Sequence, residues 1–270
     1  MLPIFFNLFE RMFKMTLHER MKQYEAVSQT HLMRRTPVII RLDGVAFHTF
    51  TRNFEKPFDK MLGKAMLWTT RSLVNNIQGC VLGYTQSDEI SLVLQDYKKL
   101  DTDAWFGYNV QKLVSVSAKM ATYEFVRAFD DILCGYDSHK CLSTYWPALK
   151  DNNVGFDSRC FNLPVEEVNN YFVDRQRDAE KNSINLLAQQ YYTQKELNGI
   201  NSKKLQDKLF TEHGVNWNDL PIDQKRGCTV IPRNDPRFEE YNGFSPIFSQ
   251  EPDFINSRII FDKEENKNDQ

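Results

Sequence analysis

Two aspartates stand where the chain could hold divalent cations. Asp43 directly follows the β-branched run at 38–42, which predicts a buried strand, and Asp88 lies in the connection between two further short apolar runs. Carboxylates at a strand end and in a neighbouring hairpin can approach each other beside a sheet, and hard cations such as Mg²⁺ prefer oxygen ligands. The pattern predicts phosphoryl-transfer chemistry at a two-metal site in which Asp43 and Asp88 bridge both ions.

Two neighbouring residues could complete this site. The backbone carbonyl of Gly44 would be a further ligand. Glu89 follows Asp88 directly, so on a regular strand its side chain would point the other way, although a turn could bring both carboxylates round. Asp43 and Asp88 could instead be ordinary turn residues, because aspartate is common in turns through its local hydrogen bonds. Spacing alone leaves both interpretations open.

The elements that must position these residues alternate between periods of two and of three to four residues. Strands are expected at 38–42, 80–84, 90–94 and 156–163, and helices at 58–78 and 101–127. The second helix would carry Trp105, Tyr108, Asn109 and Lys112 on one face. This order predicts an α+β, ferredoxin-like polymerase palm, an antiparallel sheet with helices on one face. Many unrelated proteins share that layout, so function must be argued from the site.

The remaining chain suggests how the domain is bounded. We expect a helix at 16–29, an irregular loop at 130–151, a long helix at 164–192, a short helix at 205–210 and a last strand at 228–231. The resulting division is an N-terminal extension at 1–14, a palm at 15–150, a mainly helical C-terminal unit at 151–232 that completes the palm, and a partly disordered tail at 233–270.

Composition excludes several classes of protein. A net charge of −2 excludes a globally basic nucleic-acid binder, so RNA contacts would have to come from local clusters such as Lys203-Lys204 and Lys225-Arg226, which could equally be solvated faces. Five cysteines without C-x-x-C spacing indicate neither a disulfide framework nor a zinc site. No apolar run reaches the ~20 residues of a membrane span. We therefore expect a cytoplasmic protein without membrane contact.

Several segments together resemble the tRNA(His) guanylyltransferase family. They cover roughly residues 16–232 in the family's order, which chance explains poorly. The segments are RLDGVAFHTF (41–50), FEKPFD (54–59), QSDE (86–89), FDSR (156–159), RQRD (175–178) and GVNWNDLP (214–221). The resemblance implies a polymerase-like palm, extension of RNA in the 3′ to 5′ direction, and a homotetramer or dimer.

Carried over residue by residue, the resemblance implies the members of the site. Metal ligands would be Asp43, Gly44 and Asp88, with Glu89 beside them as a further catalytic carboxylate. Contacts to nucleotides and their triphosphates are expected from His48, Lys56, Asp59, Ser87, Asn109 and Lys112. Contacts to tRNA, made mainly by the C-terminal unit, are expected from Arg175 in the family-like RQRD segment and from the local charge clusters that contain Lys203, Lys204, Lys225 and Arg226.

Two departures narrow the expectation. Where the tRNA(His)-specific enzymes have H-I-N-N, this chain has Glu180-Lys181-Asn182-Ser183, and a carboxylate at Glu180 cannot reproduce the contacts of the histidine. One turn before Lys112 stands Asn109, a pattern similar to the guanylyltransferase-like branch that repairs truncated tRNA 5′ ends.

The sequence thus predicts an Mg²⁺-dependent, template-directed 3′–5′ nucleotidyltransferase that repairs the 5′ end of tRNA with GTP, ATP and other NTPs. The alternatives are addition of a single −1 guanosine to tRNA(His), a nucleotide cyclase on the same palm, and a non-catalytic tRNA-binding protein.

Overall fold

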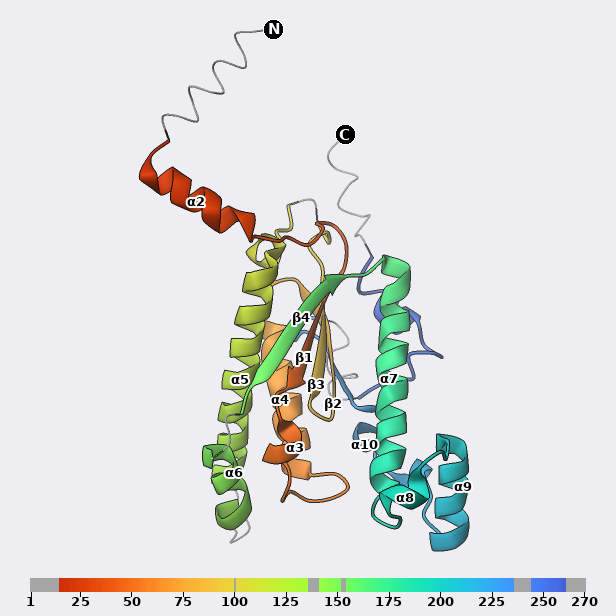
Figure 1. Cartoon of the computed structure of the whole chain (residues 1–270). Helices are drawn as coiled ribbons and strands as arrows, with labels where there is room; N and C mark the ends of the chain where they lie inside the picture. Colours follow the sequence, from red (N-terminus) through yellow and green to blue (C-terminus); the bar gives the residue numbers. More distant parts are fainter. Residues whose placement is uncertain (1–14, 100, 136–140, 152–153, 236–243, 261–270) are drawn as a thin grey trace.

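A five-stranded sheet forms the centre of the computed structural model (Figure 1), which describes residues 15–99, 101–135, 141–151, 154–235 and 244–260. All neighbouring strands are antiparallel, in the order β4-β1-β3-β2-β5. The expectations for residues 1–14 and 262–270 lie outside the described residues. The strands are β1 (Val38–Gly44), β2 (Cys80–Gln86), β3 (Glu89–Leu94), β4 (Phe156–Asn162) and β5 (Cys228–Val230).

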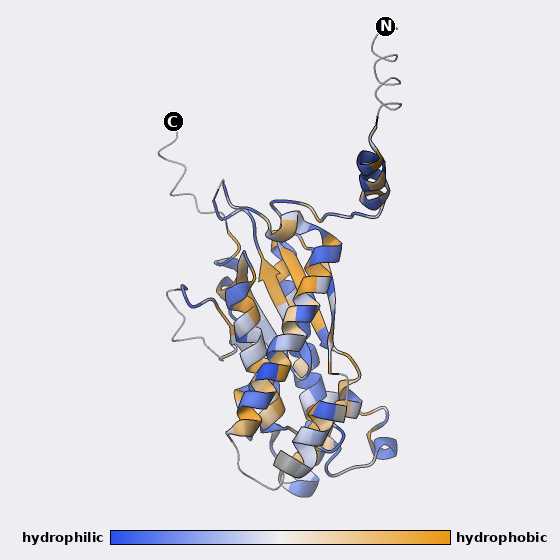
Figure 2. Ribbon diagram, turned by 90° about the vertical axis from the view of Figure 1, so that its left-hand side faces the viewer, coloured by the Kyte–Doolittle hydropathy of each residue, from blue (hydrophilic) through white to orange (hydrophobic). Residues whose placement is uncertain are grey.

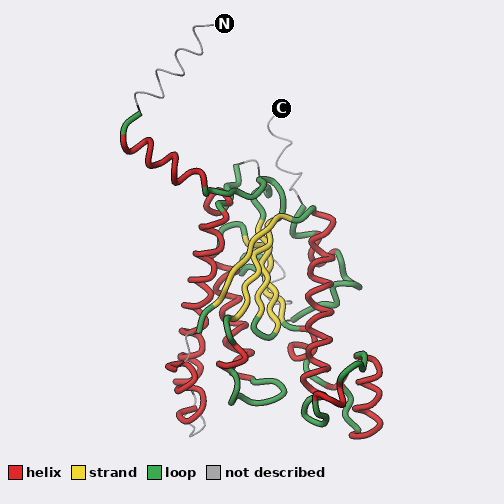
Figure 3. Tube along the Cα trace, in the orientation of Figure 1, coloured by secondary structure: helices red, strands yellow, loops and turns green. Residues whose placement is uncertain are grey.

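Helices flank the sheet on both sides (Figure 3). The order β1-α4-β2-β3-α5-β4 confirms the ferredoxin-like palm, and β5 extends it beyond β2. The helices are α2 (Leu17–Val27), α3 (Phe47–Phe50), α4 (Lys60–Asn76), α5 (Val110–Cys134), α6 (Trp146–Asp151), α7 (Val165–Ala188), α8 (Gln194–Leu197), α9 (Ser202–His213), α10 (Ile222–Arg226) and α12 (Asp253–Asn256).

One face of the sheet packs on α4 and α5. Alternate residues of β1, Val38, Ile40 and Leu42, are fully buried in this layer, as the two-residue period of a strand requires. Beneath it an aromatic cluster gathers around Phe125 of α5, whose ring centroid lies 5.3 Å from that of Phe47. Its members are Phe47, Phe50, Phe54, Phe125, Phe129, Tyr145 and Phe156. The cluster anchors the segment between β1 and α4.

The other face is covered by α7 and by residues 244–260. Ile39 of β1 packs in one cluster with Phe172 of α7 and with Phe248. Buried Gln176 fixes the late segment, since its side chain accepts a hydrogen bond from the Phe248 N–H at 3.1 Å and donates to the Pro246 carbonyl at 2.8 Å. This part of the expected tail is therefore folded into the core.

Two expectations about helices were wrong. The helix expected at 101–127 begins only at Val110, because Phe106 and Gly107 adopt left-handed φ angles of 51° and 58° and Asn109 caps the helix. The described residues of the loop expected at 130–151 are largely helical: α5 runs to Cys134, a π-helical turn spans Cys141–Tyr145, and α6 follows. The apolar stripe of α5 continues through buried Leu133, which stabilises the extra turn.

Both ends of the described chain lie beyond the end of the sheet that is opposite to the β2–β3 turn, measured along the strands. After the exposed helix α2, mostly blue in Figure 2, the Leu32 N–H donates to the Tyr108 carbonyl, and the Met33 N–H donates to Asn162 at the end of β4. At the other terminus, the Ile259 carbonyl accepts from the Tyr97 hydroxyl, just beyond β3. No helix among the described residues is long and apolar enough to cross a membrane.

Candidate active site

The β2–β3 hairpin brings Asp88 beside Asp43. Its turn has two residues, Ser87 and Asp88, because Gln86 already pairs with Glu89, and it is shorter than the connection expected at 85–89. Ser87 has a left-handed φ of 51°. The Gly44 N–H donates to the Asp88 carbonyl at 3.1 Å, and Asp43 lies opposite Glu89 across the β1–β3 pair. The ends of β1 and of the hairpin are thus tied together.

The electrostatics of this pair favour a cation. Burial raises the pKa of the Asp88 carboxyl above its ordinary value, and the nearby Asp43 carboxylate raises it further. The ion pairs within the described residues join neither carboxylate to an arginine or lysine. The same residues contain no cluster of three or more histidine, cysteine or acidic side chains able to hold a metal. Two carboxylates and the Gly44 carbonyl fit Mg²⁺, which takes its other ligands from water and substrate phosphates.

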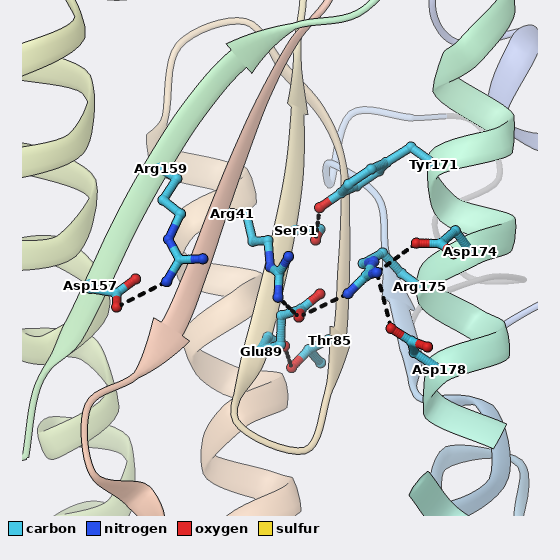
Figure 4. A network of polar contacts seen from close by, with 10 residues as sticks. All are labelled: Arg41, Thr85, Glu89, Ser91, Asp157, Arg159, Tyr171, Asp174, Arg175 and Asp178. Carbon is cyan, nitrogen blue, oxygen red and sulfur yellow. Dashed lines mark hydrogen bonds and ion pairs between the residues drawn. The ribbon is translucent and has the colours of Figure 1, made fainter. Parts of the chain in front are cut away.

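Glu89 takes part in a different contact. Its side chain is 7% exposed, and its Oε2 lies 2.8 Å from Arg41 Nη2 and 3.5 Å from Arg175 Nη1 (Figure 4). Burial raises the pKa of Glu89 although both arginines oppose the shift. Sequence reasoning gave Arg41 no role; the available signal was that Arg41 shares its face of β1 with Asp43, two residues away.

The segment between β1 and α4 carries three expected nucleotide-binding residues. His48 is exposed on α3, and Lys56 Nζ donates to the Thr51 carbonyl at 3.2 Å. Asp59 is the N-cap of α4, where its carboxylate accepts from the backbone N–H groups of Met61 and Leu62, both at 2.9 Å. It also accepts from the Glu55 N–H at 2.9 Å and the Tyr145 hydroxyl at 2.7 Å. Asp59 therefore has a clear structural role.

A cavity of about 420 Å³ opens beside the hairpin turn. Asp59 and Ser87 line it on the palm side, together with Pro57 and Phe58. Its opposite wall comes from the C-terminal unit, in which sequence reasoning had named no cavity residue: Ala179, Asn182, Ser183 and Leu186 of α7, then Pro221, Asp223, Gln224, Gly227 and Cys228. The walls are mostly apolar with a few polar groups, as is usual for small-molecule sites.

Asn109 and Lys112 lie elsewhere. Asn109 accepts from the Lys112 N–H at 3.1 Å as the cap of α5 and bridges to His31. These contacts lie at the end of the sheet where β1 begins, roughly 20 Å from Asp43 by the rise along β1. Within one chain the structure does not bring Asn109 and Lys112 to the hairpin.

The expected tRNA-binding residues divide into two groups. Arg175 and Arg226 are ion-paired within the protein, Arg226 Nε with Glu180 at 2.7 Å, and Lys225 Nζ donates to the Asn218 carbonyl at 2.6 Å. Lys203 and Lys204 are exposed on α9.

Comparisons with known proteins find relatives in one family that share this fold. The family model described as tRNAHis guanylyltransferase matches residues 18–164. A solved "Bacterial tRNA(HIS) Guanylyltransferase (Thg1)-Like Protein in complex with ATP" is 40% identical with a TM-score of 0.79, over 91% of this chain and 100% of that one. A structure of the same description with GTP is 37% identical with a TM-score of 0.73, over 91% and 99%.

A curated relative extends the comparison to eukaryotes. The tRNA(His) guanylyltransferase of Schizosaccharomyces pombe is 28% identical over 252 residues, which cover 86% of this chain and 85% of the relative. The family model alone spans more than half of the 270 residues. This chain belongs to the tRNA(His) guanylyltransferase family and is a nucleotidyltransferase.

Proposed function

We propose that the protein is a template-dependent 3′–5′ nucleotidyltransferase that repairs tRNA 5′ ends. The observation that carries this proposal is that Asp43 at the end of β1 and Asp88 in the hairpin turn lie close together, beside a cavity of nucleotide size that Ser87 lines. Two facts favour repair over addition of a single guanosine to tRNA(His). Glu180, which stands where the tRNA(His)-specific enzymes have a histidine, forms an ion pair with Arg226 at 2.7 Å. The structures at 40% and 37% identity are described as guanylyltransferase-like.

The donor set at the hairpin fits two Mg²⁺ ions. Asp43, Asp88 and the Gly44 carbonyl would hold them. The positive charge of the ions would favour the ionised form of Asp88 and so offset the rise in its pKa that burial causes. Bound Mg²⁺ lowers the pKa of an attacking hydroxyl and neutralises charge on the leaving group. The protein's own contribution is to fix the two carboxylates at one edge of a rigid sheet.

The reaction has two phosphoryl transfers. ATP or GTP first activates the 5′ monophosphate of the RNA, with release of pyrophosphate. The 3′ hydroxyl of the incoming NTP then attacks the activated 5′ phosphate and displaces the nucleoside monophosphate, or pyrophosphate when the end is already a triphosphate. His48, Lys56 and Ser87 supply hydrogen-bond donors and charge for the phosphates. Pairing with the opposite strand selects the nucleotide, while the protein supplies orientation.

The cavity would hold the base of the activating nucleotide. Leu186 of α7 lines the cavity wall opposite the palm side, so we expect Leu186→Trp to fill part of the space and to raise the KM for ATP at least about tenfold, a loss typical of a mismatched apolar pocket. Leu186→Met conserves volume and serves as the control. Steady-state kinetics with ATP varied would measure both, and an unchanged KM in the tryptophan variant would place the base elsewhere.

A 5′-truncated, monophosphorylated tRNA with labelled NTPs tests the function directly. When the base opposite the gap is varied, we expect the added nucleotide to follow it. Guanosine addition to tRNA(His) alone would instead establish the narrower specificity. Binding of NTP without any tRNA binding would favour a cyclase, and tRNA binding without turnover would favour a non-catalytic protein.

A further inference from the structure

Helix α7 contacts strand β3 at two points directly after Asp88. The hydroxyls of Tyr171 and Ser91 share a hydrogen bond of 2.8 Å, and Arg175 Nη1 lies 3.5 Å from Glu89 Oε2 (Figure 4). Four residues along a helix rise about 6 Å, and two residues along a strand rise about 6.7 Å. The spacing of the two residues on α7 therefore matches that of their partners on β3, and the two contacts fix the start of β3 against α7.

Glu89 is the point at which three elements meet. Arg41 of β1 and Arg175 of α7 both contact its Oε2, and Asp174 and Asp178 hold Arg175 from the other side at 2.5 and 3.0 Å. The side chain of Arg175 is 14% exposed. Among the described residues, the buried atoms Glu89 Oε1, Arg41 Nε and Arg175 Nε have no hydrogen-bond partner. The network therefore depends on its ion pairs.

This environment leaves Arg175 little capacity to bind RNA. Three carboxylates surround its guanidinium, and a phosphate in the same place would be repelled by them. The position suits contact with Glu89, which directly follows Asp88 and lies opposite Asp43 in the strand pair.

We propose that Arg175 is a positioning residue for the metal ligand Asp88, acting through Glu89, an inference that rests on the proposed function. Together with Arg41 it holds the Glu89 carboxylate, which lies opposite Asp43 in the strand pair, and partly balances this third negative charge beside Asp43 and Asp88. Removal of Arg175 leaves a buried carboxylate with one partner instead of two, which is costly in a poorly solvated site, and frees the hairpin residue next to the metal ligand.

The test is a titration of the full chain with Mn²⁺ in the presence of saturating GTP. The electron paramagnetic resonance signal of free Mn²⁺ measures how much Mn²⁺ is bound. We expect Arg175→Ala to raise the Mn²⁺ dissociation constant about tenfold, the lower end of the loss usual for residues that orient metal ligands. The KM for tRNA should stay within about twofold. Arg127→Ala is the matched control, because Arg127 pairs only locally with Glu124 on α5 at 2.7 Å. Thermal unfolding by circular dichroism would establish that each variant folds.

Two further variants separate the roles. Arg175→Lys keeps the charge and should recover part of the Mn²⁺ affinity, and it replaces the alanine variant if that one does not fold. Glu89→Gln combined with Arg175→Ala should be less than additive, since both act through one contact.

Three results would overturn the inference. If the wild type adds nucleotides and Arg175→Ala binds Mn²⁺ normally, positioning through Glu89 is wrong while the proposed function stands. A raised KM for tRNA with unchanged Mn²⁺ binding, additive with Glu89→Gln, would make Arg175 a direct RNA contact. A wild type that neither binds Mn²⁺ nor adds nucleotides would remove both proposals together.

Discussion

Asp88→Asn is expected to abolish nucleotide addition, with a loss on the order of 10³-fold in kcat/KM. The amide keeps the size of the carboxylate but removes the charge that would hold a divalent cation, and several kcal/mol of charge stabilisation correspond to about this factor. Single-turnover addition of labelled GTP to a truncated tRNA measures it. Residual activity above a tenth of wild type would show that Asp88 is not a metal ligand.

The same variant should unfold at a higher temperature when divalent cations are absent. The folded state raises the pKa of Asp88, mainly through burial, so at neutral pH folding works against its ionised form. Wild-type stability therefore falls as pH rises through the range of this carboxyl, and asparagine avoids that loss. The advantage of Asp88→Asn should be present at pH 7 and vanish in acid below the pKa of an unfolded aspartate.

Ligand-induced stabilisation supplies the control for this prediction. Mn²⁺ with GTP should raise the melting temperature of the wild type, because a ligand that binds only the folded state stabilises it, and should raise that of Asp88→Asn much less. Equal shifts in both proteins would place the cation elsewhere.

Phe125→Ala should cause the largest loss of stability, about 3–5 kcal/mol, the range for removal of a buried phenylalanine. Phe125 is fully buried, and its ring centroid lies 5.3 Å from Phe47, 5.9 Å from Phe50 and 5.6 Å from Phe129. The void that the missing ring leaves in the core would also loosen the segment that carries His48 and Lys56. Chemical denaturation measures the free energy of unfolding.

Phe125→Leu is the matched variant, which keeps most of the apolar volume and should lose much less stability. If Phe125→Ala cost no more than about 1 kcal/mol, the aromatic cluster would not be a tightly packed core, because removal of a buried phenylalanine costs about 3–5 kcal/mol. Activity measured well below the melting temperature tests the second part: we expect a raised KM for NTP from the loosened segment, which Phe125→Leu should largely avoid.

The palm could be predicted because its elements carry strong local signals. The alternation in β1, Val38, Ile40 and Leu42 against Ile39 and Arg41, marks a strand buried on one face. Helix α4 also lies within two residues of its expected span. The start of α5 could not be found, because the pattern around Trp105 is helical while the left-handed φ angles of Phe106 and Gly107 break it. Periodicity does not register such a turn.

At the site, sequence reasoning named the residues but not their partners. Asp43 and Asp88 were singled out by the family resemblance of the segments that contain them, because their spacing alone is equally typical of turn residues. The contacts of Glu89 with Arg41 and Arg175 depend on how α7 lies over the sheet, which no local pattern specifies. The cavity wall from α7 and α10 is a similar case, since residues more than 90 positions after Ser87 complete it. Such features depend on packing between distant parts of the chain, and the local patterns of a single sequence do not predict that packing.

The placement of both described ends beyond the same end of the sheet has a practical consequence. A fusion partner joined before Met15 would lie at the outer end of α2, and one joined after Ile260 would lie beside Ile259, both remote from Ser87 and Asp88 (Figure 1). Immobilising the protein on a sensor chip through either end should therefore leave the end of the sheet that carries the proposed active site facing the solution. Kinetics of tRNA capture could be recorded there without the tether crossing the substrate's path.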